Sequence, residues 1–203
     1  MFNATQGKSF TFRFVQLICT STGGGIIVPI LLNLIPVPIA QDAFPVAVLV
    51  NYFIHTYFPI IREVYALSPP LKTVINCLFE IFRAFVVCKF TGVAGQKIPP
   101  SDFSFAVFGP IFCGTIAGCG GAFFPLSKGF DPIAKGVAPP MYSAFVGATF
   151  FHLFTQLPSL NQGMIDVPKK ANVMVAIFFM SYNLYKTFFV PASIPVKKEQ
   201  KTA

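Results

Sequence analysis

The chain carries two opposite charges three residues apart inside a long apolar stretch. Glu80 and Arg83 interrupt the segment Leu71–Gly95, and at this spacing both side chains project from one face of a helix. A charge near the centre of a bilayer costs about 2.5–3.5 kcal/mol on insertion scales, so it normally faces a partner, water or a substrate path. Two interpretations are open: an ion pair that joins helices, or the lining of a polar pathway or headgroup site, which we favour.

Glycines form the second candidate feature, because one glycine-containing motif occurs twice. Gly24 and Gly25 begin the sequence GGIIVP, and Gly120 and Gly121 begin GGAFFP. Each motif ends in proline, which leaves a carbonyl group one turn earlier without its hydrogen bond and favours a kink. Close packing of helices is the alternative explanation, since Gly114 and Gly118 have the spacing of small residues at membrane-helix contacts. The candidate pore-lining or gating residues are Glu80, Arg83, Gly24, Gly25, Gly118, Gly120 and Gly121.

The repetition extends beyond the glycines. Tyr52–His55 reads YFIH and Thr149–His152 reads TFFH, in the same order as the glycine motifs and at nearly the same offset of about 96 residues. Two apolar segments that recur at one period predict a duplicated structural unit.

Composition indicates how these residues are positioned. Hydrophobic residues make up 54% of the chain and charged residues 11%, with a mean hydropathy of +0.68, whereas soluble domains carry about twice that share of charge. The apolar residues fall into blocks near the ~20 residues that a spanning helix needs. We therefore expect an all-α polytopic membrane protein with six transmembrane helices, over residues 13–35, 43–61, 71–95, 103–126, 141–157 and 171–190. Polar, proline-marked turns are expected between them, including one at residues 62–70.

Basic residues in the expected loops predict the orientation. Nine lie on one side (Lys8, Arg13, Arg62, Lys72, Lys128, Lys135, Lys197, Lys198 and Lys201) and four on the other (Lys89, Lys97, Lys169 and Lys170). Both termini are therefore expected in the cytosol. The net charge of +8 suits anionic lipid headgroups, and its dispersal over many loops argues against nucleic acid as a partner.

The repeat and the span count together predict the domain organisation. A period of three spans inverts the second copy relative to the first, which is the inverted-repeat plan of many transport proteins. The third span then opens the second repeat, and its counterpart in the first repeat would lie before Met1. The expected divisions are a cytosolic segment 1–12, an incomplete first repeat 13–61, a second repeat 71–157, a final helix 171–190 and a basic cytosolic tail 191–203.

Other residue types offer no further chemistry. The five cysteines lie within the apolar segments without CxxC spacing, as small apolar fillers do. The chain has no phosphate-binding loop, nucleophile elbow, HExxH or paired acidic motif. We expect no enzymatic activity, no catalytic residue and no metal site.

Several motifs resemble those of the trimeric intracellular cation channels, which have seven spans built from two inverted three-helix repeats and a last helix. Leu78–Arg83 is similar to the L-K-E-V-x-R signature of that family, and Gly114–Gly120 to its G-W-V-K-G-S-G. Phe130–Gly136 resembles F-E-Q-L-L-R-G, and Gly147-Ala148 with Phe151 and Leu153 resembles the sixth helix. Tyr57–Lys72 resembles the third helix and the start of the fourth. The opening helix of the family is absent from residues 1–203.

The resemblance implies a homotrimeric potassium channel of the endoplasmic reticulum or nuclear envelope membrane, which supplies counter-ion flux during calcium release from stores. In the family, a lysine and an arginine of the signature hold a phosphatidylinositol bisphosphate headgroup. Phe79 replaces that lysine here and Ala117 replaces a second one. Only Arg83 is retained, so the headgroup-binding candidates are Arg83 and Lys72, and no tightly held cofactor is expected.

Two other functions stay open on the sequence. Inverted repeats around kinked helices also suit a secondary transporter with alternating access. The absent helix and the replaced lysines also suit a non-conducting relative that assembles with a full-length channel.

Overall fold

The computed structural model describes residues 7–100, 102, 105–124, 129–134 and 136–189, and within these ranges the chain is helical with no strand. Pro125, the expected source of the second kink, and the tail 191–203 lie outside the described residues. The elements are α1 (Phe10–Ser21), α2 (Gly24–Leu31), α3 (Val37–Ala40), α4 (Ala43–Tyr57), α5 (Pro59–Leu67), α6 (Pro69–Lys97), α7 (Phe108–Cys119), the 3₁₀ helix η2 (Gly120–Phe123), α8 (Asp131–Ala134), α9 (Pro139–Gln156), α10 (Pro158–Asn161) and α11 (Val167–Phe189).

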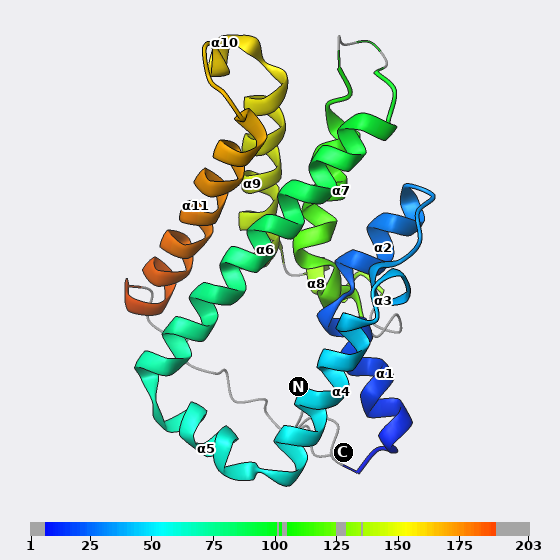
Figure 1. Ribbon diagram of the computed structural model, residues 1–203, viewed down its shortest axis with the longest axis vertical. Coiled ribbons are helices and arrows are strands. Elements are labelled where there is room, and N and C mark those ends of the chain that lie inside the picture. The colour runs from blue at the N-terminus through cyan, green and yellow to red at the C-terminus, as the bar shows by residue number, and fades with distance from the viewer. Residues whose placement is uncertain (1–6, 101, 103–104, 125–128, 135, 190–203) are drawn as a thin grey trace, which may run out of the picture.

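Helix α6 is the long central element of the bundle (Figure 1). Its 29 residues span about 43 Å at 1.5 Å per residue. It begins at Pro69 and Pro70, which suit the first turn because the backbone N–H groups there have no partner within the helix. Helices α7, α9 and α11 pack directly on it.

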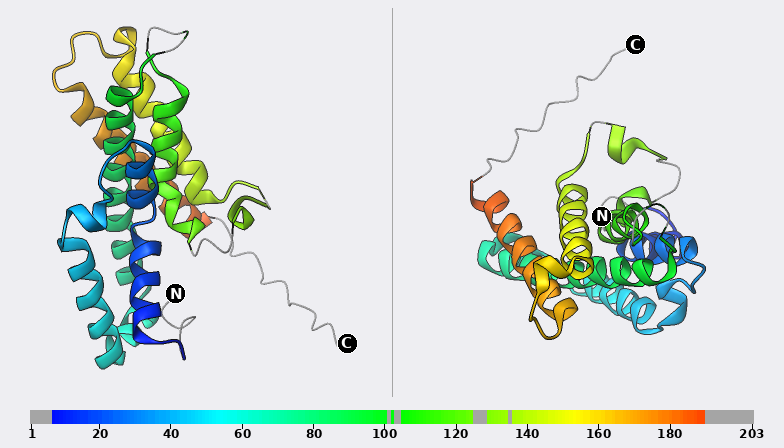
Figure 2. Two further views of the ribbon diagram at one scale, coloured as in Figure 1. Left: turned by 90° about the vertical axis from the view of Figure 1, so that its right-hand side faces the viewer. Right: turned by 90° about the horizontal axis from the view of Figure 1, so that it is seen from above.

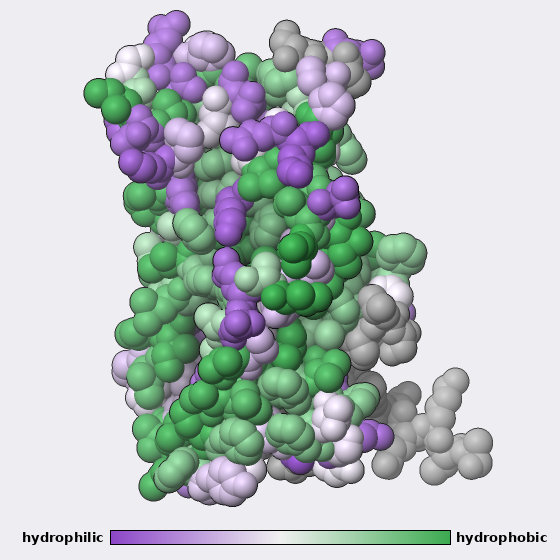
Figure 3. All heavy atoms as spheres, turned by 45° about the vertical axis from the view of Figure 1, so that its right-hand side comes forward, coloured by the Kyte–Doolittle hydropathy of each residue, from purple (hydrophilic) through white to green (hydrophobic). Residues whose placement is uncertain are grey.

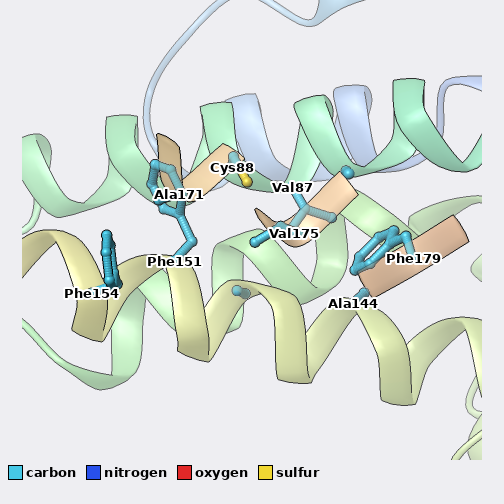
Figure 4. Close-up of a cluster of buried hydrophobic side chains, with 10 residues drawn as sticks. Val87, Cys88, Ala144, Phe151, Phe154, Ala171, Val175 and Phe179 are labelled. Atoms are coloured by element: carbon cyan, nitrogen blue, oxygen red, sulfur yellow. The ribbon is translucent and has the colours of Figure 1, made fainter. Parts of the chain in front are cut away.

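Small and aromatic side chains form the main core between α6, α9 and α11 (Figure 4). Phe179 and Val175 of α11 are fully buried there, against Ala144 and Ala148 of α9 and Val87 of α6. The alanines allow the helix backbones to approach, and the rings fill the space that remains.

The first two expected spans, 13–35 and 43–61, are each broken into two helices. A bend was expected in the first span at its glycine motif, whereas none was expected in the second. Helices α1 and α2 meet at an angle of 65°, and α4 and α5 at 89°. Pro59 has no N–H to continue α4, and it restricts the backbone of Phe58 before it, so α4 ends at Tyr57. The turn expected at residues 62–70 is also wrong up to Leu67, because Arg62 and Glu63 lie within α5. Polar residues on the exposed face of an amphipathic helix imitate a turn in the sequence.

The later helices agree more closely with the expected spans. The third, fifth and sixth spans correspond to α6, α9 and α11, each within four residues at either end. The fourth is shorter than expected, since α7 begins only at Phe108 and narrows to a 3₁₀ helix at Gly120. Over the described residues, no single helix is both long and apolar enough to cross a membrane, whereas the bent pairs α1–α2 and α4–α5 meet those criteria by length and composition.

The two glycine motifs of the repeat lie against each other, where α2 runs beside the end of α7 (Figure 2). A Cβ atom added at Gly24 would overlap the carbonyl group of Ala117, and one added at Gly120 would overlap the backbone of Gly24. The chain breaks just before this contact, at Thr22 and Gly23, and α2 then continues as an α-helix through Pro29. Only glycine permits this approach of two backbones.

The two halves of the chain are packed unequally. At an offset of 97 residues, His55 matches His152, and the same offset pairs Ala47, Val50 and Asn51 of α4 with Ala144, Gly147 and Ala148 of α9. All three residues of α9 are buried, whereas all three of α4 are exposed. The helix neighbours that cover α9 therefore have no equivalent on α4 among the described residues.

Replacing Gly24 by alanine should destabilise the protein, because the new methyl group meets backbone rather than a movable side chain. Overpacking of this kind costs about 1–3 kcal/mol, which lowers the unfolding temperature of a chain of this size by roughly 2–4 °C per kcal/mol. Thermal unfolding of the purified protein in detergent measures the effect.

Gly92→Ala is the matched control within a helix. Its Cβ would lie 3.7 Å from Phe151 Cε1, an ordinary contact, and alanine favours the helix by about 0.5–1 kcal/mol. An unfolding temperature that falls equally in both variants would contradict the backbone contact.

Candidate functional site

Arg83 is a buried charge with partners on three helices. It projects from α6 toward α9 and α11, and 8% of its surface is exposed. Its Nη2 lies 2.8 Å from Glu80 Oε2 and donates a hydrogen bond to Ser143 Oγ, while Nη1 donates to the carbonyl oxygen of Pro140 over 3.3 Å. The guanidinium carbon lies 4.5 Å from the centre of the Phe179 ring, as in a cation–π contact.

Local sequence explains each of these partners. Glu80 is one turn before Arg83 on α6, so the two side chains reach each other along the helix surface. Pro140 stands in the first turn of α9, where proline is tolerated. Ser143 donates a second hydrogen bond to the Pro140 carbonyl, over 3.2 Å. The first turn of α9 thereby supplies both an acceptor hydroxyl and an acceptor carbonyl to Arg83.

A large cavity opens on one side of this cluster, with a volume of about 600 Å³. We call it the central cavity. Segments from both halves of the chain line it: the end of α1, the start of α2, the middle of α6, the end of α7 and the start of α9. Its wall includes all seven candidate pore-lining or gating residues, namely Gly24, Gly25, Glu80, Arg83, Gly118, Gly120 and Gly121.

Lys89 and Lys72 occupy different environments. Lys89 was counted among the loop residues, but it lies within α6 and lines the central cavity. Lys72 is exposed near the start of α6 and lines neither cavity described here. Lys72 and Arg83 are 11 positions apart, which corresponds to about 16 Å along the helix. The two expected headgroup-binding residues are thus not brought together, whereas Arg83 and Lys89 share one cavity wall.

A second, smaller cavity of about 80 Å³ lies on the α9 and α11 side of Arg83. We call it the lateral cavity. Lys186, Asn183 and Tyr182 of α11 face it together with Glu80 and Arg83. Sequence reasoning missed Lys186, which is the lone charge in the expected sixth span, and Ser143, whose hydroxyl group stands in an apolar segment. Like Glu80, both are polar residues inside an apolar segment of the sequence, and this feature could have identified them.

His152 is buried and structural in its contacts. Its Nε2 forms a hydrogen bond with the carbonyl oxygen of Ala106, and its ring packs edge-on against Phe105. Within the described part of the chain, no three His, Cys, Asp or Glu side chains are grouped so that they could hold a metal ion.

Hydrophilic side chains gather at the upper end of the face shown in Figure 3 and in a narrow strip below it, while apolar side chains cover most of the rest. Large exposed apolar residues are spread over most helices, for example Val74, Leu78 and Phe82 on α6. Comparison of the chain with protein-family models, with curated proteins and with solved structures finds no match.

The Glu80–Arg83 pair should show strong energetic coupling. Arg83→Met leaves Glu80 without its ion-pair partner, and breaking a buried pair by removing one member typically costs about 3–5 kcal/mol. Adding Glu80→Gln to Arg83→Met should recover part of the loss, with a coupling free energy of about 1–3 kcal/mol. Unfolding of the two single variants and the double variant measures it, and strictly additive losses would contradict the pairing.

Proposed function

We propose that the chain is an integral membrane protein that conducts monovalent cations, mainly potassium, through the central cavity. One observation carries the proposal. The seven residues that the sequence predicts as pore-lining lie on α2, α6, α7 and η2, and they border a single cavity of about 600 Å³, beside the contact between Gly24 and Gly120.

The apolar surface of the bundle and the length of α6 support a location in a membrane. Apolar side chains cover much of the bundle (Figure 3), and the ~43 Å length of α6 exceeds the ~30 Å hydrocarbon core. Non-helical backbone at membrane depth is tolerated where it lines a cavity, and the breaks at Thr22–Gly23 and at Gly120 both border the central cavity. The contact between matching glycines suits an inverted repeat with a pseudo-two-fold axis.

Cation passage is supported by main-chain oxygen atoms. Helices α1 and α7 end at Ser21 and Cys119, both at the central cavity. The last carbonyl groups of a helix lack partners within it and carry partial negative charge. Rings of carbonyl oxygens replace the hydration shell of potassium in selective channels. The proposal assigns the same task to the carbonyl groups at these helix ends.

Charged side chains on the wall of the central cavity set the energy barrier that a passing cation meets. Glu80 and Arg83 neutralise each other, which leaves Lys89 as a positive charge on the cavity wall. We propose that an anionic lipid headgroup at Arg83 and Lys89 offsets that charge. The two residues are six positions apart on α6, about 9 Å along its axis, and both border the same space.

The resemblance to trimeric intracellular cation channels extends the proposal. It implies a homotrimer in the endoplasmic reticulum or nuclear envelope membrane, with both termini in the cytosol, that supplies counter-ion flux during calcium release.

Purified protein in a planar bilayer under a potassium chloride gradient should show unitary currents that reverse near the potassium potential. In a bilayer of zwitterionic lipid, which supplies no anionic headgroup, Lys89→Gln should raise potassium conductance, because it removes a positive charge from the cavity wall. Lys97→Gln is the matched control, since Lys97 is an exposed lysine at the end of the same helix and does not line the cavity. Equal potassium conductance in the wild type and both variants would show that Lys89 does not border the ion path.

Glu80→Gln should act in the opposite direction. It leaves the charge of Arg83 without its carboxylate partner at the cavity wall, so potassium conductance or the preference for cations should fall. Saturable, substrate-coupled flux without unitary currents would favour the secondary transporter instead. Activity that appears only after co-assembly with a full-length channel would favour a non-conducting relative.

A further inference from the structure

The geometry points to a binding site for a small monovalent anion of halide size in the lateral cavity between α6, α9 and α11. The site lies on the opposite side of Arg83 from the headgroup proposed for the central cavity, shares that one residue with it and does not depend on ion conduction. Arg83 and Lys186 are its cations, and Asn183 supplies a neutral donor.

Unfilled hydrogen-bond donors are the first observation. Arg83 Nε and Asn183 Nδ2 are both buried and have no hydrogen-bond partner among the described residues, and both residues line the lateral cavity. Arg83 itself is more than nine-tenths buried. A buried donor left unpaired costs about 1–3 kcal/mol, so an acceptor is expected beside it.

Charge is the second observation. Glu80 offsets one of the two cations at this cavity, which leaves one positive charge among the residues that line it. Lys186 comes from the last turn of α11 and lies near enough to Glu80 to interact with its charge. One monovalent anion would neutralise the site, whereas a cation would add to the excess.

Size is the third observation, and it decides between classes of anion. The cavity holds about 80 Å³, which suits one small anion or a few water molecules, since roughly 10–15 Å³ of such space accommodates one water. An inositol phosphate or other lipid headgroup would extend beyond this volume. The lateral cavity therefore matches an ion such as chloride in size.

The test measures chloride binding directly, by the broadening of the ³⁵Cl resonance in the presence of purified protein in detergent and its reversal by bromide. Wild-type protein should broaden the line in a saturable manner. Asn183→Ala should weaken the affinity about tenfold, as loss of one hydrogen bond to a charged group does. Lys186→Met should abolish saturable broadening.

Lys169→Met is the matched control, because Lys169 lies on the same helix with a side chain that is 81% exposed and paired with Asp166. It should leave the broadening unchanged. Thermal unfolding in potassium chloride and in potassium gluconate, at equal ionic strength, provides the second measurement. Chloride should stabilise the wild type and the Lys169→Met variant but not Lys186→Met.

Absence of saturable broadening with folded wild-type protein would overturn the inference and assign the cavity to water alone. Equal broadening by the wild type and the Lys186→Met variant would overturn it as well. Neither result bears on the conduction experiment, which uses the central cavity and a different lysine.

Discussion

The need to neutralise one buried guanidinium determines how the second half of the chain is assembled. Arg83 lies in the middle of α6 and is almost fully enclosed, so each face of its planar group requires a partner. Glu80 supplies a carboxylate, the start of α9 supplies Ser143 and the Pro140 carbonyl, and α11 supplies the ring of Phe179. These contacts fix three helices around one charge, and the apolar core of Figure 4 continues from the same place.

The first half of the chain has no comparable anchor. Helix α1 buries no residue and α4 buries only Tyr52 within the described ranges. The first half joins the rest mainly through α2. Gly24 meets the backbone of α7 there, and Val28 packs with Phe90 of α6 and Cys113 of α7 in a second apolar cluster. The central cavity lies between a rigid group of helices on one side and a more loosely packed pair on the other. A change in the bend between α1 and α2 would alter the cavity without disturbing the Arg83 cluster.

Much of the fold could be predicted from the sequence, and the exceptions have physical causes. The limits of α6, α9 and α11 follow from prolines and from continuous apolar segments, which hydropathy detects well. A kink was expected at the first glycine motif, and α1 and α2 bend by 65° just before it, at Thr22 and Gly23. The break in the second span was not expected, because summed hydropathy is the same for a straight helix and a bent one. Pro59 marked one break, and the Thr22–Gly23 break depends on the close approach of α7, a contact distant in sequence.

The sequence predicted some residues of the candidate site and not others. Glu80 and Arg83 were evident because they share one helix face, and the glycines because they recur. Lys186 and Ser143 were not. Lys186 shares the lateral cavity with Arg83, and Ser143 accepts a hydrogen bond from Arg83, at separations of 103 and 60 residues in the sequence. Lys89 was counted with the loop charges although it lies inside the expected span 71–95, and α6 places it on the cavity wall.

Arg83, Glu80 and Pro140 border both cavities, so these residues form the shared wall between them. A wall of this kind makes the two compartments thermodynamically linked, because an ion on one side changes the field that an ion on the other side experiences. Such linkage is reciprocal: if an occupant of the lateral cavity changes affinity in the central cavity by some factor, the converse holds by the same factor. The single arginine would then act as a relay, through which the composition of the salt solution adjusts events on the opposite side of α6.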